Sequence, residues 1–166
     1  GLSTSGTLTV ADLDTTDILT ATRTLTVTGS SDRGDAAAPS DAELLAMLTL
    51  TPTTILDGST NTASLGWSFD SGSEAFDYLA TGETLVLTYT VQATDDDGTP
   101  LNDTETVTIT ITGSNDAPVI TDGPDTAALT ETDGGLSTSG TLTVADLDTT
   151  DVVTATRDRK SVVKGK

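Results

Sequence analysis

The sequence repeats itself at a distance of 134 residues. Residues 1–17 read GLSTSGTLTVADLDTTD, and residues 135–151 are identical to them. When the comparison is continued through residues 23 and 157, 21 of 23 positions match. A unit of this length can enclose a hydrophobic core of its own, so the period is typical of whole domains in tandem and not of a solenoid built from units of roughly 20–50 residues.

The repeat predicts three parts of the chain. Residues 1–113 form most of one repeat, and we expect this unit to lack its opening strand because residues 114–134 have no counterpart ahead of residue 1. Residues 114–157 would then be a linker followed by the truncated start of the next repeat. Residues 158–166, DRKSVVKGK, contain all four lysines and arginines beyond position 157 and break the composition, so we interpret them as a non-native tail.

Charge and composition narrow the possible functions. The formal net charge is −19, and binding to nucleic acids or anionic membranes needs Lys and Arg to displace counterions, so divalent cations are the more natural partners. The chain has no His and no Cys, which excludes the common catalytic triads, thiol nucleophiles and zinc sites. We therefore expect a protein that is not an enzyme. No apolar run approaches the roughly 18 residues of a membrane helix, so we expect no direct membrane insertion.

Alternating side chains predict β-strands along most of residues 1–113. Residues 85–93 alternate Leu, Leu, Tyr, Val and Ala with mostly polar positions, and residues 106–112 alternate Val and Ile with Thr. A period of two with threonine on the wet side indicates strands with one buried face. The intervening residues 94–104 contain Asp-Gly and Pro, so an antiparallel hairpin is expected. Shorter runs of the same kind occupy residues 7–10, 18–22, 24–28, 48–50 and 65–69.

These strands, separated by turns, predict an all-β sandwich. One helix is expected within it. Ser40 followed by Glu43 forms a capping-box pattern, and the apolar residues 44, 45, 47 and 48 come directly after it. We expect a short helix that packs on the sandwich.

Acidic side chains gather where predicted strands end. Calcium takes about six to eight oxygen ligands in flexible geometry, which several loops meeting at one end of a sandwich can supply. Without a cation, so many like charges in one place are unfavourable. Asp and Asn are also common in turns that bind nothing, so the pattern by itself leaves a metal site and plain acidic turns both open. The clusters are Asp12, Asp14 and Asp17; Asp95, Asp96 and Asp97; and Asn115 and Asp116.

The sequence resembles a known family. Residues 85–120, LVLTYTVQATDDDGTPLNDTETVTITITGSNDAPVI, resemble the last two strands of a cadherin repeat and its linker, with the A-T-D-x-x-G turn and the N-D-x-P junction. The whole unit is more specifically similar to the VCBS repeats of large bacterial surface proteins, often found with RTX-type adhesins, through the motifs GTLTVADLD, LGWSFD, FDYLATGETLVLTYTVQATDDDG and VTITITGSNDAPV. The resemblance covers nearly all of residues 1–157 and implies antiparallel Ig-like or cadherin-like sandwiches in tandem.

The resemblance also implies calcium ligands at one pole of the sandwich. Asp12 and Asp14 match the D-x-D pair that binds calcium in cadherins, and Asp95 matches the aspartate of the A-x-D turn. In a cadherin-like sandwich these three carboxylates converge at the N-terminal pole. Asp97, in the same acidic turn as Asp95, completes the set that we expect there.

A second set of calcium ligands is implied at the junction between repeats. Asn115 and Asp116 match the linker N-D, and Asp146 and Asp148 are the repeat copies of the D-x-D pair. The sequence departs from the family at Leu79, where a glutamate is expected, so the junction site would be built differently from that of a cadherin.

Two functions are consistent with the sequence. In the first, the unit is a structural spacer in which calcium joins neighbouring repeats of the same chain into a stiff stalk. In the second, the unit itself binds a polysaccharide or another surface ligand. Only two Phe, one Trp and two Tyr occur, and Trp67 alternates with Phe69 as core residues of a strand do, which leaves few exposed platforms for sugars. The sequence favours the spacer, and the resemblance implies an extracellular location on a bacterial surface.

Overall fold

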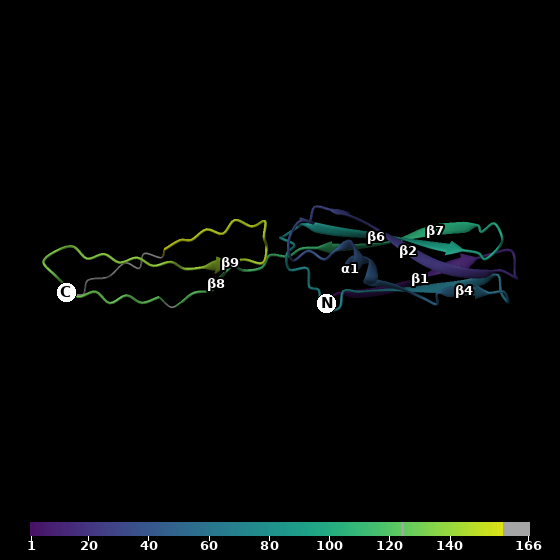
Figure 1. The fold of residues 1–166 in the computed structure, drawn as a ribbon, viewed down its shortest axis with the longest axis horizontal. Helices are drawn as coiled ribbons and strands as arrows, with labels where there is room; N and C mark the ends of the chain where they lie inside the picture. The colour runs from purple at the N-terminus through teal and green to yellow at the C-terminus, as the bar shows by residue number, and fades with distance from the viewer. Residues whose placement is uncertain (124, 158–166) are drawn as a thin grey trace, which may run out of the picture.

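The computed structural model describes residues 1–123 and 125–157, and the expected tail, residues 158–166, lies outside the described residues. Most of the regular structure lies in residues 1–113 (Figure 1). In chain order, the elements are β1 (Ser3–Ala11), β2 (Ile18–Gly29), α1 (Asp41–Ala46), β3 (Leu48–Thr51), β4 (Thr54–Asp57), β5 (Thr62–Asp70), β6 (Thr84–Thr94), β7 (Asn102–Thr112), β8 (Val119–Ile120) and β9 (Val144–Ala145).

Two antiparallel sheets enclose the hydrophobic core. One sheet has the strand order β1-β5-β3 and the other has the order β4-β2-β6-β7. Core residues come from both sheets, for example Leu65 and Phe69 on β5 and Leu87 and Tyr89 on β6, each at most 1 % exposed. The prediction of an all-β fold with antiparallel sheets is therefore confirmed.

The strand pattern explains the most regular part of the fold. β6 and β7 form the expected antiparallel hairpin, with Leu85 opposite Ile111. The residues that alternate towards the inside of β6 are buried, as their period of two predicts. The two short runs expected at residues 18–22 and 24–28 are a single strand, β2, because the backbone of Arg23 pairs with Val91 without interruption.

Strand β4 is absent from the sequence expectations. Its two apolar residues, Ile55 and Leu56, are consecutive and both buried, at 7 % and 2 % exposed. A strand of four residues with both neighbouring side chains buried has no period of two, so the alternation that identified the other strands gives no signal here.

Helix α1 begins with the expected capping box. The backbone N–H of Glu43 donates to the Ser40 hydroxyl, and the Glu43 carboxylate accepts from the Ser40 backbone N–H at 2.8 Å. Leu44 is fully buried, and its carbonyl accepts a 2.6 Å hydrogen bond from the hydroxyl of Tyr89 on β6. Burial raises the pKa of Tyr89 to about 12. The helix is thus attached to the core by apolar packing and by hydrogen bonds from side chains of the sheet.

The two ends of the sandwich have different neighbours. At the outer pole, β1 leads into residues 12–17 and β6 leads into residues 95–101. At the junction pole, β7 ends and the chain continues into residues 114–157. Figure 1 shows this last part as a long, narrow arm that leaves the junction pole. Within the arm, β8 pairs with β9 in antiparallel register.

Candidate metal centre

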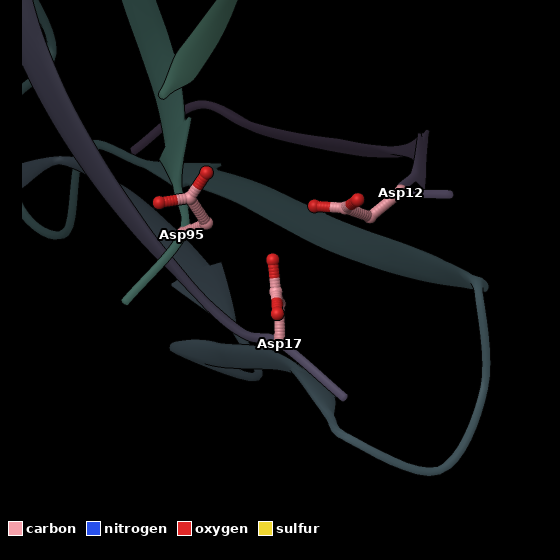
Figure 2. Close-up of side chains that lie close together, drawn as sticks. All are labelled: Asp12, Asp17 and Asp95. Carbon is pink, nitrogen blue, oxygen red and sulfur yellow. The ribbon is translucent and has the colours of Figure 1, made fainter. Parts of the chain in front are cut away.

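Three carboxylates gather at the outer pole. Asp12, Asp17 and Asp95 each offer one carboxylate oxygen, and these oxygens lie within 4.8 Å of one another. Figure 2 shows the three side chains around a common space. Asp12 and Asp17 come from the connection between β1 and β2, and Asp95 comes from the connection between β6 and β7. Carboxylate oxygens from loops are the usual ligands of hard divalent cations, so this group can hold a metal ion.

Local hydrogen bonds shape the connection that carries Asp12 and Asp17. The N–H of Asp14 donates to Oδ1 of Asp12 at 2.9 Å, and the N–H of Asp17 donates to the carbonyl of Asp14 at 3.2 Å. The Asp12 N–H donates to the Asn61 carbonyl at 2.9 Å and so continues the pairing with β5. A side-chain bond to the backbone two residues on is the turn that aspartate favours, so the spacing D-x-D-x-x-D closes this connection locally.

Asp95 is fixed by its own hairpin loop. Its two carboxylate oxygens accept hydrogen bonds from the N–H of Leu101 at 3.1 and 3.0 Å, and Oδ1 also accepts from the N–H of Asp97 at 3.3 Å. Asp96 accepts a 2.9 Å bond from the N–H of Ile18, at the start of β2. This contact holds the two acidic connections side by side although they are far apart in the sequence.

The outer cluster concentrates negative charge. Asp17 is only 9 % exposed. Burial raises the pKa of Asp17, and the charges of Asp97, Asp12, Asp14 and Asp95 raise it further, in that order. Each of these effects disfavours the ionised carboxylate. A cation bound among the three oxygens would stabilise the ionised form of each carboxylate.

The described basic side chains near the sandwich bind elsewhere. Nε of Arg23 donates to the carbonyl of Leu45 at 3.3 Å, and the guanidinium of Arg33 forms a 2.8 Å ion pair with Asp41. Neither contact involves a residue of the outer cluster. A bound cation would supply a counter-charge to this cluster.

The acidic connection recurs at residues 146–151 with the same hydrogen bonds. The N–H of Asp148 donates to Oδ1 of Asp146 at 3.1 Å, and the N–H of Asp151 donates to the carbonyl of Asp148 at 3.0 Å. These bonds are the counterparts of those in residues 12–17. Because the two connections have different surroundings, we attribute their common conformation to their common sequence.

The second copy faces the junction pole. Asp148 is 1 % exposed, and its Oδ2 accepts a 2.7 Å hydrogen bond from the N–H of Asp116. Its Oδ1 is buried and has no hydrogen-bond partner among the described residues. Burial raises the pKa of Asp116, and the charges of Asp148, Asp77 and Asp146 add to that effect. A buried carboxylate oxygen without a partner is costly, and a cation is one group that would satisfy it.

At the outer pole, the structure brings together only part of the expected ligand set. Asp12 and Asp95 lie in the three-carboxylate group, whereas Asp14 and Asp97 contribute no oxygen to it. Asp17, which the sequence analysis placed in the acidic clusters but not among the expected ligands, takes the third place. Its position three residues after a D-x-D pair and directly before a strand is the signal that could have identified it.

At the junction pole, three of the four expected ligands meet. Asp116, Asp146 and Asp148 lie close enough to influence one another. Asn115 is exposed, and its amide donates to the carbonyl of Asp116 at 2.6 Å. Asp77, which the sequence analysis did not include among the ligands, adds a further negative charge near Asp116. Asp77 lies two residues before Leu79, the position at which the sequence departs from the pattern that it resembles.

Comparisons of this chain with protein families, with curated proteins and with solved structures find no match. Among the residues that the structure describes, no helix has the length and apolar character needed to cross a membrane.

Proposed function

We propose that this chain is a calcium-stabilised spacer: part of a stalk of VCBS-type, cadherin-like repeats in a large secreted or cell-surface bacterial adhesin. The observation that carries the proposal is that one acidic connection occurs twice with the same hydrogen bonds, at opposite poles of one sandwich. At residues 12–17 it faces a carboxylate of its own unit, and at residues 146–151 it faces carboxylates of the preceding unit.

The two copies together suggest the make-up of a complete repeat junction. The first and last aspartates of the connection would bind a cation on the side of the following unit, because Asp12 and Asp17 lie beside Asp95. The middle aspartate would bind on the side of the preceding unit, as Asp148 does with Asp116. A cation at such a junction would have carboxylates from two units around it. Removal of the cation would leave like charges facing each other.

Calcium suits these sites better than magnesium. Calcium accepts about six to eight oxygens in irregular geometry, whereas magnesium requires a near-ideal octahedron and keeps several of its waters. The carboxylates here lie on loops, and the oxygens of Asp95 are already engaged by the N–H of Leu101, which favours the more tolerant ion. Extracellular calcium modules bind with dissociation constants of roughly 0.1–1 mM, in keeping with a cell-surface location.

Cation binding would fix the orientation of successive units. Contacts between the arm and the sandwich already exist. The hydroxyl of Thr150 lies 3.3 Å from a carboxylate oxygen of Glu83, to which it donates. The N–H of Ala37 and then the hydroxyl of Thr149 lower the pKa of Asp35 by hydrogen bonding. A cation beside these weak polar contacts would convert its binding free energy into a defined angle between units.

The aromatic residues favour the spacer over the polysaccharide-binding alternative. Phe69, Phe76, Tyr78 and Tyr89 are each at most 3 % exposed. Trp67 is half-buried and packs against the core, where its indole covers a glycine of β1. Sugar-binding sites commonly use an exposed aromatic ring as a platform, and each of these five rings is engaged in packing.

The charge of the chain supports a role after export. With a net charge of −19, mutual repulsion destabilises the compact state unless cations offset it. Calcium is scarce in the cytosol and plentiful outside the cell. The unit would therefore be loosely folded before export and compact afterwards, which suits secretion of an unfolded chain.

Small-angle X-ray scattering of the full chain tests the proposal. We expect the distribution of interatomic distances within the molecule to be narrower in about 2 mM calcium than in chelator, because the arm becomes fixed against the sandwich. Magnesium at the same concentration serves as the control for ionic strength and should have a much smaller effect. Scattering curves that superimpose in calcium, magnesium and chelator would overturn the proposal.

A further inference from the structure

On one side of the sandwich, β1 and β7 each have an outer edge with which no described strand pairs, and two hollows, together called the groove, lie between these strands. β1 and β7 are the last strands of their sheets, and the start of β1 lies beside the end of β7. Towards the outer pole, a hollow of about 540 Å³ is lined by apolar side chains, among them Leu8 and Val10, and by carboxylates, among them that of Glu105. Unpaired edge strands beside apolar side chains can accept a further strand.

The hydrogen-bonding groups on the free edge of β1 can be identified. The N–H of Asp12 donates to the carbonyl of Asn61, just before β5, and the carbonyl of Leu2 accepts from the N–H of Ser71, just after β5. The backbone N–H and carbonyl groups of the even-numbered residues of β1 therefore point towards β5. In an antiparallel strand, alternate residues direct their backbone groups to opposite sides. Thr9 and Ala11 therefore present their N–H and carbonyl groups to the open edge.

The sequence of β1 occurs a second time in the chain, and there it is paired with residues 119–120. Residues 141–145 repeat residues 7–11 letter for letter. In β8–β9, Val119 lies opposite Ala145, and Ile120 lies opposite Val144. The N–H of Thr121 donates to the carbonyl of residue 143 at 2.9 Å, which is the repeat counterpart of Thr9. The copy of β1 thus uses the backbone group that β1 itself leaves free.

Asp148 and Asp14 occupy equivalent positions in the two repeat copies, and only the copy whose strand is paired with residues 119–120 has a buried aspartate. Asp148 is 1 % exposed because Asp116 covers it with a hydrogen bond. Its repeat counterpart, Asp14, is exposed. The contact surface for residues 116–121 is therefore present twice in the sequence, at residues 143–148 and at residues 9–14, and it is covered only at the first of these.

We infer that residues 116–121 of a second copy of this chain dock on the free edge of β1, with Val119 opposite Ala11 and Ile120 opposite Val10. The segment of the same molecule cannot reach this register. Val119 is six residues beyond Gly113 at the junction pole, a span of at most about 20 Å. Ala11 is at the other end of a nine-residue strand, about 30 Å away.

Docking on β1 offers more burial than the pairing within the arm. Val144 is 44 % exposed and Ile120 is 60 % exposed, since the described residues form no second layer over the β8–β9 pair. On β1, Ile120 would lie beside Val10, whose side chain packs against the core. Residues 117–121 are uncharged, so within the docking segment only Asp116 adds to the negative charge of the outer pole. Exchange between two copies therefore gains apolar contact that the arm lacks.

Sedimentation velocity of the full chain tests the exchange. The measurement is made in chelator, so that its outcome is independent of calcium, and in about 0.5 M NaCl to screen repulsion between the acidic chains. Between about 10 μM and about 1 mM protein, we expect reversible conversion of monomer into dimer, accompanied by slower hydrogen exchange at the amides of Thr9 and Ala11. A chain that stays monomeric throughout this range would overturn the inference.

The same substitution in the two repeat copies gives a matched pair. Thr9→Pro removes an N–H that points away from β5, a position where an edge strand tolerates proline, and should weaken the dimer at least about tenfold. Thr143→Pro weakens the competing pairing within the arm and should strengthen the dimer. Equal effects of the two substitutions would contradict the inference.

A second pair of variants leaves β1 intact. Ile120→Ser removes the side chain that would enter the groove, and Val119→Ser changes the neighbouring residue, which would face outward opposite Ala11. Both positions are more than half exposed, so neither change should unfold the sandwich. We expect Ile120→Ser to abolish the dimer and Val119→Ser to preserve it; preservation in both would sink the proposed register.

Discussion

The buried carboxylate of Asp148 accepts a 2.7 Å hydrogen bond from the backbone N–H of Asp116 through one oxygen, while its other oxygen has no hydrogen-bond partner among the described residues. This pair joins the arm to the junction pole of the sandwich. In the proposed stalk, the free oxygen would be a cation ligand, and the Asp116 amide would report on whether the junction is closed.

Replacement of Asp148 by asparagine should uncouple the junction from calcium. Asparagine keeps an acceptor for the Asp116 N–H but removes the negative charge that a cation needs. In the unmodified chain, we expect calcium to slow hydrogen exchange at the Asp116 amide by on the order of tenfold. In Asp148→Asn, exchange should be the same with calcium and with chelator.

The equivalent position at the outer pole provides the control. Asp14→Asn is the same chemical change at the repeat copy of Asp148, and Asp14 is exposed. It should leave the calcium response of the Asp116 amide intact. An Asp116 amide that ignores calcium in the unmodified chain would argue against a cation at the junction.

Asp17→Asn should separate the two roles of the outer cluster. Because burial and neighbouring carboxylates raise the pKa of Asp17, removal of its charge should stabilise the fold in chelator. In calcium, the loss of one charged ligand should weaken binding by on the order of tenfold. Titration calorimetry measures the affinity, and thermal unfolding in chelator measures the change in stability.

Asp133→Asn removes the same unit of charge from an exposed position in the arm and is the matched control. Its calcium affinity should equal that of the unmodified chain. If Asp133→Asn and Asp17→Asn weaken calcium binding alike, the effect comes from net charge and the site assignment is wrong.

The stability of the chain in chelator should rise on mild acidification. The pKa values of Asp17 and Asp116 are raised above the ordinary value of 3.8, so their contribution to stability is full below 3.8 and is lost as pH rises through the higher, folded pKa values. The pKa values of Asp35, Glu43 and Asp57 are lowered, so their contribution is present at neutral pH and is lost below about pH 4.

These opposing groups place the expected maximum of stability in chelator below neutral pH, above the range in which the carboxyls with lowered pKa values become protonated. Thermal unfolding across pH 3 to 7 measures it. Asp17→Asn should reduce the gain in stability on acidification from pH 7, and calcium should reduce it as well. A melting temperature that falls steadily from pH 7 downward in chelator would contradict the assigned directions of the Asp17 and Asp116 pKa values.

Tyr89→Phe should destabilise the sandwich by about 1 kcal/mol, because the carbonyl of Leu44 loses the Tyr89 hydroxyl and keeps only the N–H of Met47 as a donor. Tyr78→Phe is the control: the Tyr78 hydroxyl lies beside the guanidinium of Arg33 but outside hydrogen-bonding geometry, so its removal should change stability by less. Urea unfolding gives both free energies. Equal losses in the two variants would show that the bond from Tyr89 to Leu44 contributes little.

The sequence predicts the parts of this fold that are governed by local patterns. The alternation around Leu85 and Tyr89 identifies β6 because every second residue of that strand from 85 to 91 is buried. The capping box of Ser40 and Glu43 identifies the start of α1 because both of its hydrogen bonds are local. β4 has no such pattern, since Ile55 and Leu56 are both buried by contacts that form only after the two sheets meet.

The candidate site divides in the same way. The positions of the acidic residues in the sequence show that they gather where strands end. The D-x-D turn at residues 12–14 depends only on its own sequence. Which carboxylates converge depends on how two connections distant in sequence meet. Asp17 enters the outer cluster, and Asp97 stays beside it, because the bond between Asp96 and Ile18 fixes that meeting. The position of Asp17 after the D-x-D pair is a local signal, but the convergence of its connection with that of Asp95 is not encoded locally.

Thermal unfolding of the full chain in chelator and in about 2 mM calcium tests the central claim most directly, with magnesium as the control. If acidic connections share a bound cation, linkage requires calcium to raise the melting temperature, by about 5 °C when calcium is roughly tenfold above its dissociation constant. Unfolding curves that coincide in chelator and in calcium would contradict the account.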